Sequence, residues 1–386
     1  MSADFSTRIN RREVTSTKWQ AYDDDVLPLW VADMDIAVPD CVQQALTQRI
    51  AHGVYGYANP PASTRNALSE WSRSHYDWAI ENEWQHWLPG VVPALHVAAQ
   101  ALCAADEEVL VITPIYPPFL KVAEHTQRRM VTVPMAEPSE ANGQRWTLDI
   151  EALERAVTPK TRLLLWCHPH NPTGRVYDDD ELNALADVVE RHDLLVCSDE
   201  LHCDLILEGT AHRPLAKSAP HIAHRTITLW AASKTFNIAG LTCACAVIPD
   251  PELRQRFAAG CEGWMPSHNV LGVVATEAAY RGGESWRQQL IRHLQGNVAL
   301  IQSYVNRWPN ARFLAPQATY LGWIDLRRAA LGDTPQQVLL KEARVALSDG
   351  ADFGHPGFVR INFGTTREIL EEALQRIDRC IAARQR

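Results

Sequence analysis

A lysine, an aspartate and an asparagine each stand at or just beyond the end of an apolar run in the middle of the chain. Lys234 ends TITLWAASK, Asp199 lies in DLLVCSDE, and Asn171 follows RLLLWCHPH. Desolvation at such a strand end depresses a lysine pKa, which favours imine formation and later proton abstraction by the free amine. A carboxylate is costly to bury without a partner, and a pyridinium nitrogen is a suitable one. The pattern favours imine chemistry on a cofactor with a pyridine ring.

Three further roles fit the same cofactor. Asn171 could donate to a phenolic oxygen, and Tyr116, after VLVITPI, could stack on the ring. Arg360, in the alternating run GFVRINFG, could grip a substrate carboxylate with two parallel hydrogen bonds. Each residue alone also has an ordinary explanation as a surface lysine, helix cap, turn residue, core aromatic or exposed arginine. Their joint order along the chain favours pyridoxal 5′-phosphate (PLP).

These side chains can act together only in a fold that brings the ends of several strands close to one another. Apolar runs rich in β-branched residues predict strands at 107–114, 162–169, 193–200, 226–233 and 242–249. Amphipathic patterns predict helices at 117–126, 179–192 and 250–260. Continuous apolar strands separated by helices predict an α/β fold with a doubly wound, mainly parallel sheet covered on both faces. Ligands in such sheets bind beyond the carboxyl ends of the strands.

The last third of the chain has a different pattern. A long helix is predicted at 284–308, followed by a strand at 318–327, a helix near 334–344, a strand at 358–364 and a closing helix. We expect a large PLP-binding domain at 45–280. A smaller α+β domain would combine 1–44 with 281–386.

Composition excludes several other classes of protein. The 386 residues are 46% hydrophobic and 22% charged, with a formal net charge of -9, and no basic block suggests nucleic-acid binding. No apolar run is long enough to span a bilayer, and the polar N-terminus predicts no secretory signal. Nine scattered cysteines fit a reducing cytoplasm. Phosphate-loop, dinucleotide, nucleophile-elbow and zinc motifs are missing, and no metal site is expected; His168 and His170 are predicted to be turn or packing residues.

Across nearly its whole length the chain resembles the fold-type I PLP enzymes, the aspartate aminotransferase superfamily. NPTG (171–174) and Ser233-Lys234 mark the superfamily, while WVADMD (30–35) and SDELH (198–202) resemble its MalY/PatB-like cystathionine β-lyase (C–S lyase) branch. The resemblance implies a seven-stranded sheet and PLP as cofactor. It also implies α,β-elimination of cystathionine or related S-substituted cysteines to a thiol, pyruvate and ammonia.

The resemblance also assigns roles by position. Lys234 would form the Schiff base and shuttle protons, Asp199 would pair with the pyridine nitrogen, Asn171 would bind the phenolic oxygen, and Tyr116 would stack on the ring. Arg360 would bind the substrate α-carboxylate, and Ala32 would line the pocket through its backbone. The cofactor phosphate would be bound by the amides of Ala94 and Leu95, at a helix start near Ala94, and by Ser233. Tyr57 would reach the phosphate of the partner subunit, which implies a homodimer.

Two positions depart from the superfamily pattern. Ala231 stands where many members have serine, and Thr242 stands where many aminotransferases have a phosphate-binding arginine. Lyases of this branch often lack that arginine too, which favours a lyase. A class I/II aminotransferase remains the alternative because it would use the same residues. A ligand-sensing regulator with an aminotransferase-like domain is a second alternative, but such fusions need a DNA-binding segment, and WVADMD already begins at residue 30.

Overall fold

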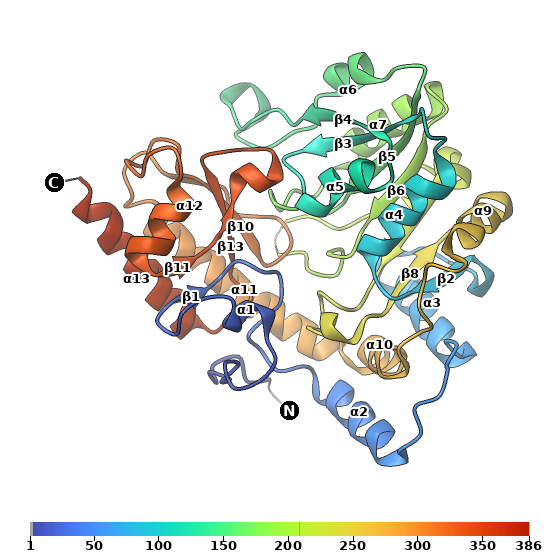
Figure 1. Cartoon of the computed structure of the whole chain (residues 1–386), viewed down its shortest axis with the longest axis horizontal. Helices are drawn as coiled ribbons and strands as arrows, with labels where there is room; N and C mark the ends of the chain where they lie inside the picture. Colours follow the sequence, from blue (N-terminus) through green and yellow to red (C-terminus); the bar gives the residue numbers. More distant parts are fainter. Residues whose placement is uncertain (1–2, 208, 386) are drawn as a thin grey trace.

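A seven-stranded sheet is built from strands within residues 85–247 (Figure 1). The computed structural model describes residues 3–207 and 209–385. The strand order is β2-β8-β7-β6-β5-β3-β4, and only β8 runs antiparallel to its neighbours. Its strands are β2 (Gln85–Leu88), β3 (Glu108–Thr113), β4 (Arg129–Pro134), β5 (Thr161–Cys167), β6 (Leu195–Asp199), β7 (Thr226–Trp230) and β8 (Ala244–Val247). The predicted doubly wound, mainly parallel sheet is confirmed.

Alternate residues of the central strands enter two different apolar cores. In β5, Leu163 and Leu165 belong to one buried cluster, whereas Leu164 and Trp166 belong to the other. This is why the strand is apolar at successive positions, since both faces of the sheet are covered. The first core includes α4 (Val91–Leu102), α5 (Pro117–His125) and α9 (Pro251–Cys261), and the second includes α6 (Ile150–Ala156), α7 (Asp179–Arg191) and α8 (Leu215–Ser218).

A smaller antiparallel sheet of four strands follows in the last third of the chain, in the order β12-β13-β10-β9. Its strands are β9 (Arg312–Phe313), β10 (Leu321–Asp325), β12 (Ser348–Asp349) and β13 (Phe358–Asn362). The helices α11 (Glu284–Val305) and α13 (Arg367–Ala383) contact each other and share one core cluster with β10 and β13. The helix expected near 334–344 is a short α12 (Pro335–Val338) that continues as a π-helical turn over Leu339–Ala343.

The two ends of the chain meet in this smaller domain. Strand β1 (Leu27–Pro28) pairs in parallel with β11 (Val345–Ala346), and α1 (Thr17–Gln20) lies close to them (Figure 1). The chain then leads through α2 (Asp40–His52) and α3 (Ala62–Tyr76) to the large domain, where both helices pack against α10 (Val270–Gly282). The predicted boundaries at 44/45 and 280/281 fall within α2 and α10, and the domain division itself stays a prediction.

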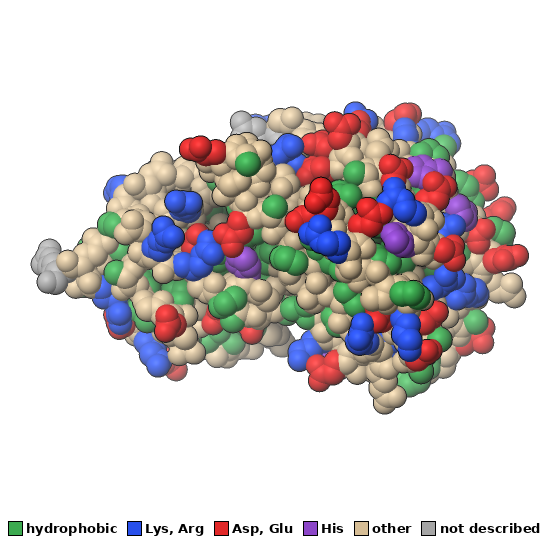
Figure 2. Space-filling view, turned by 90° about the horizontal axis from the view of Figure 1, so that it is seen from above, with side chains coloured by type: hydrophobic (Ala, Val, Ile, Leu, Met, Phe, Trp, Pro, Cys, Tyr) green, Lys and Arg blue, Asp and Glu red, His purple; other side chains and the backbone are tan. Residues whose placement is uncertain are grey.

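No helix among residues 3–207 and 209–385 is long and apolar enough to cross a membrane. On the face shown in Figure 2, Lys and Arg side chains are interspersed with Asp and Glu. The nine cysteines are all free, and eight of them are buried, including Cys243 and Cys245 beside or within β8.

Candidate active site

Lys234 and Asp199 come from neighbouring strands and lie at the same edge of the sheet. Asp199 is the last residue of β6, and Lys234 lies four residues beyond the end of β7, which pairs with β6. Burial raises the pKa of Asp199 to about 7, although the amide of Leu201 and the positive charge of Lys234 oppose the rise. Burial, assisted by the charge of Arg360, lowers the pKa of Lys234 to about 8. About one tenth of Lys234 is therefore an uncharged nucleophile at pH 7.

The carboxylate of Asp199 has unused hydrogen-bonding capacity. Its Oδ1 accepts from the Leu201 amide at 3.2 Å, and no other hydrogen bond to it is found within the described part of the chain. Asp199 is only 5% exposed, and its second oxygen is free to accept from a bound donor. A protonated pyridine nitrogen has the required charge and a single N–H.

Asn171 and Arg360 lie far apart in the sequence and meet directly. Asn171 lies in the loop after β5, where its Oδ1 accepts from Nη1 of Arg360 at 3.1 Å. Because a guanidinium can only donate, this contact fixes the side-chain oxygen toward Arg360 and directs the Nδ2 donor elsewhere. The orientation fits the predicted donation from Asn171 to a phenolic oxygen.

Arg360 is held in place before any substrate binds. From β13, its Nη2 donates to the carbonyl of Trp30 at 2.9 Å and to Ser348 Oγ at 3.3 Å, and its guanidinium carbon lies 4.8 Å from the centre of the Phe353 ring. Burial lowers its pKa to about 10, so it stays charged at neutral pH. Its buried Nε has no partner among the residues that the structure describes.

Tyr116 and Ser233 lie at the same edge. Tyr116 precedes α5 as its N-cap residue, is partly buried, and has its pKa raised by burial; Arg360 and Asp199 lie near enough to influence it. Ser233 is partly buried, directly before Lys234. The structure thus brings Tyr116, Asn171, Asp199, Lys234 and Arg360 to one place, as predicted.

The predicted helix start near Ala94 is wrong. Helix α4 begins at Val91, with Gly90 as its N-cap residue. Ala94 and Leu95 are the fourth and fifth helical residues, so their amides bond to carbonyls four residues earlier and are not free to bind a phosphate. The free amides of this turn belong to Val91 and Val92, because Pro93 has no N–H.

The segment Trp30–Ile36, here called the crossing segment, runs over Lys234 and Arg360. The carbonyl of Ala32 accepts from Nζ of Lys234 at 2.6 Å and from the hydroxyl of Tyr320 at 3.0 Å. Ala32 therefore reaches the site through its backbone, as expected, although its observed contact is with Lys234.

Two residues of this site escaped the sequence analysis, His202 and Tyr320. His202 is 4% exposed, and its Nδ1 has no partner among the residues described; its ring lies edge-on to that of Tyr320, with centroids 5.8 Å apart. Burial and the charges of Lys234 and Arg360 lower the pKa of His202 to about 3, so it is neutral. Its position in SDELH, three residues after Asp199, is the sequence feature that could have identified it as a site residue.

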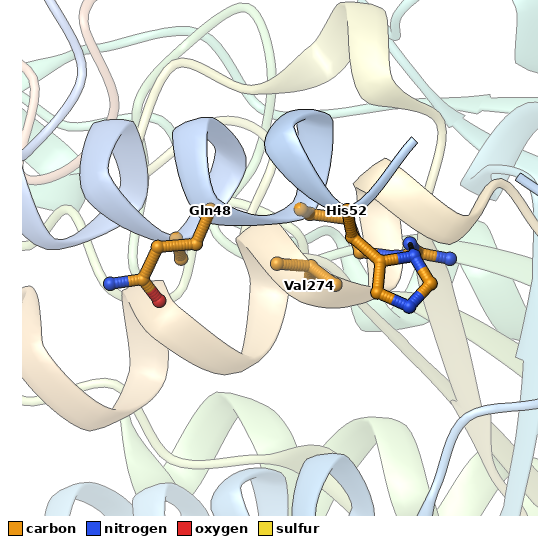
Figure 3. A pocket seen from close by; sticks show the side chains of 5 residues that line it. Gln48, His52 and Val274 are labelled. Carbon is orange, nitrogen blue, oxygen red and sulfur yellow. Dashed lines mark hydrogen bonds between the residues drawn. The ribbon is translucent and has the colours of Figure 1, made fainter. Parts of the chain in front are cut away.

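Tyr57 lies apart from these residues. It is 97% exposed in this single chain, and Tyr55 is 52% exposed. A separate hollow of about 460 Å³ is lined by residues of α2 and α10. Gln48 and His52 flank Val274 there (Figure 3). It contains none of the predicted catalytic residues and is not the candidate active site.

Comparison with known proteins agrees with this geometry. The sequence profile of the family "Aminotransferase class I and II" matches residues 24–377. Cystathionine beta-lyase PatB of Bacillus subtilis is 35% identical over 97% of this chain and 98% of its own length. The crystal structure of OvoB superposes with a TM-score of 0.94 at 42% identity, covering 98% of this chain and 99% of that one. Cystalysin from Treponema denticola, whose structure contains pyridoxal 5′-phosphate, has a TM-score of 0.94 at 30% identity, covering 99% and 100% of the two chains.

These matches extend over nearly the whole chain and share its fold. The chain therefore belongs to the class I and II aminotransferase family. Within that family, its curated relatives include cystathionine β-lyases at 30–35% identity.

Proposed function

We propose that this protein is a PLP-dependent C–S β-lyase that cleaves cystathionine or a related S-substituted cysteine to a thiol, pyruvate and ammonia. The observation that carries the proposal is the buried Asp199 carboxylate, open to one more donor, at the same sheet edge as a lysine with its pKa lowered to about 8. Relatives named cystathionine β-lyase and structures of PLP-bound C–S lyases support this activity.

The residues present fit PLP. When bound, PLP supplies an aldehyde that forms imines with amines and a ring that accepts the electron pair left at Cα. Asp199 would hold the ring nitrogen in its protonated form, and Nδ2 of Asn171 would donate to the phenolic oxygen. Tyr116 would stack on the ring. For the phosphate, the helix start observed here favours the amides of Val91 and Val92, together with Ser233.

Arg360 and Lys234 would perform substrate binding and proton transfer. Arg360 would bind the α-carboxylate and fix the orientation of Cα. Lys234, released by the substrate amine, would remove the proton from Cα. Loss of the β-sulfur as a thiolate then needs little assistance because a thiolate is a fair leaving group. The aminoacrylate that remains hydrolyses to pyruvate and ammonia.

We also propose a homodimer in which Tyr57 reaches the phosphate site of the partner subunit. Tyr57 is 97% exposed, and exposed apolar side chains nearby include Ile50 and Val54. The loop that carries Trp264, 73% exposed, leads to His268, which pairs with Ala58. A second copy of the chain would bury this aromatic surface. A cytoplasmic location, supported by the nine free cysteines, stays a prediction.

A product assay separates the two enzymatic possibilities. Purified protein reconstituted with PLP would be incubated with cystathionine, with and without an added 2-oxo acid. We expect pyruvate and a free thiol without the 2-oxo acid. Amino-group transfer that depends on the 2-oxo acid, with no pyruvate released, would identify an aminotransferase and overturn the lyase proposal.

A further inference from the structure

The crossing segment is held by two asparagine side chains, one from each domain. Asn237 lies three residues after Lys234, and Asn362 lies two residues after Arg360. Neither residue is needed by the chemistry proposed above. Both donate hydrogen bonds from their side-chain amides to backbone carbonyls of the crossing segment.

Asn362 anchors the segment to the small domain. It is fully buried, and its Nδ2 donates to the carbonyls of Val31 and Asp33, each at 2.6 Å. Its backbone amide donates to the carbonyl of Leu29 at 2.9 Å, immediately before the segment. The side-chain oxygen of Asn362 accepts from the amide of Gly364, so both the N–H₂ group and the oxygen of its side chain have partners at this junction.

Asn237 anchors the segment to the large domain. Its Oδ1 accepts from the Met34 amide at 3.0 Å, and its Nδ2 donates to the carbonyls of Met34 at 2.9 Å and Ile36 at 2.7 Å. The side-chain amide of Asn237 thus pairs with both the N–H and the C=O of Met34, as a residue on a neighbouring strand would. The backbone of Asn237 has a φ of 57°, a conformation that asparagine tolerates better than most residues.

The two carbonyls that contact the reactive side chains, those of Trp30 and Ala32, lie on either side of Val31 in the part of the segment that Asn362 holds, and Asn237 holds the part that follows. The carbonyl of Trp30 accepts from Arg360, and that of Ala32 accepts from Lys234. The fit is close: a Cβ added to Gly364 would lie 2.6 Å from Cγ of Met34. A small shift of the segment would therefore change the positions available to both reactive side chains.

We propose that Asn237 and Asn362 are positioning residues that fix the crossing segment, so that the carbonyls of Ala32 and Trp30 set the places of Lys234 and Arg360. The functional part rests on the proposed PLP chemistry. The anchoring itself does not, because the hydrogen bonds are made by the chain alone.

Hydrogen exchange of the cofactor-free protein tests the anchoring. Asn237→Ala and Asn362→Ala should each raise amide exchange in peptides covering residues 30–36 about tenfold or more, as expected from the loss of buried hydrogen bonds. The matched control is Gln85→Ala. Gln85 is also a buried side-chain amide, but its Nε2 donates to the carbonyl of Arg65 at 3.1 Å and to Ser69 Oγ at 2.9 Å, away from the crossing segment. The control should leave exchange at 30–36 unchanged.

The functional readouts are the rate at which Lys234 captures PLP and the KM for an amino-acid substrate. Asn237→Ala should slow capture about tenfold, and Asn362→Ala should raise KM about tenfold through Arg360. If an asparagine variant does not fold, Gly364→Ala takes its place in the experiment. This variant keeps both asparagines but displaces Met34, and it should also increase exchange at 30–36.

The outcomes separate the two proposals. Unchanged exchange at 30–36 in the folded variants, or an equal increase in Gln85→Ala, would overturn the anchoring. Increased exchange with normal PLP capture and normal KM would overturn the positioning role. Failure to release pyruvate from cystathionine, with the exchange and capture results as expected, would instead overturn the lyase reaction alone.

Discussion

Nη1 of Arg360 donates to Oδ1 of Asn171 across 3.1 Å and joins β13 to the loop after β5. The contact orients both groups at once: the asparagine keeps its Nδ2 for another acceptor, and the guanidinium keeps its place beside Trp30. The proposed substrate-carboxylate site and the proposed cofactor site are therefore linked by this hydrogen bond.

Arg360→Lys should raise KM about 100-fold, because an ammonium cannot reproduce the planar two-point grip on a carboxylate. Steady-state kinetics over a range of amino-acid concentrations measures the change. Arg312→Ala, which alters an exposed arginine of β9, is the control and should leave KM unchanged. A normal KM for Arg360→Lys would remove Arg360 from carboxylate binding.

Lys234→Ala should abolish the yellow colour of the protein and its borohydride-reducible chromophore. The reason is that Lys234 supplies the amine, with its pKa lowered to about 8, that bonds the cofactor. Absorbance spectra before and after borohydride treatment, together with mass spectrometry of the reduced peptide, measure the loss. A reducible chromophore that persists in the variant would show that another amine holds the cofactor.

Asp199→Ala should reduce turnover by about 100-fold or more and weaken PLP binding, since the ring nitrogen loses the carboxylate that keeps it protonated. Circular dichroism should show a normal fold, because the carboxylate has only one hydrogen bond, to the Leu201 amide, among the described residues. Turnover close to that of the unmodified enzyme would leave Asp199 as a simple cap of the turn that follows β6.

The contribution of Asp199 and Glu200 to the stability of the cofactor-free protein should fall as the pH rises toward 7. Burial raises the pKa of Asp199 from 3.8 to about 7 and that of Glu200 from 4.5 to about 7. In the folded protein these carboxyls keep their protons more tightly than in the unfolded chain, so deprotonation costs stability between the unfolded and folded pKa values. Buried histidines such as His170 and His202, whose pKa values are lowered, contribute in the opposite direction, so the effect is a difference: the Tm of Asp199→Asn relative to the unmodified protein should rise with pH in this window.

Thermal unfolding of the cofactor-free protein at several pH values, with Asp187→Asn on the exposed face of α7 as a control, measures this effect. The control should follow the unmodified protein. A Tm difference between Asp199→Asn and the unmodified protein that does not change with pH would show that Asp199 titrates normally.

Hybrid dimers should show whether Tyr57 serves the partner's site. Tyr57→Ala and Lys234→Ala are each expected to be poorly active. Reassembling equal amounts should restore about one quarter of normal activity, because half the dimers are hybrids with one intact site. Mixing Lys234→Ala with Asp199→Ala is the control, since both residues act in their own chain and neither hybrid site is intact. No recovery in the first mixture would assign Tyr57 to its own chain or to no site.

The central strands and their terminal residues were predictable because burial on both faces leaves an unbroken apolar run, as in β5, before polar Asp199 or Asn171. Strands β2 and β4 were not predicted. β2 contains Gln85 and His86, and β4 lies at the sheet edge with only one buried residue, so neither has that pattern. The start of α4 was misplaced because Pro93 occupies its third position, whereas proline is more typical of the first.

The contribution of His202, Tyr320, Asn237 and Asn362 could not be predicted for a different reason. Each is a single polar residue in an otherwise ordinary segment, and its importance comes from contacts across more than 100 positions of sequence, as between Asn237 and Met34. Periodicity describes the face that a residue presents within its own element. It contains no information about a segment that crosses from the other end of the chain.

The pairing of β1 with β11, and of the crossing segment with Asn362, has a consequence for biosynthesis. Leu27 and Pro28 pair with residues that are made more than 300 positions later, and Val31 is held by Asn362 over a similar separation. Long-range contacts of this kind form late in folding. The crossing segment is thus fully held only after β13 has been translated, and we expect a nascent chain to have no activity before that strand is made.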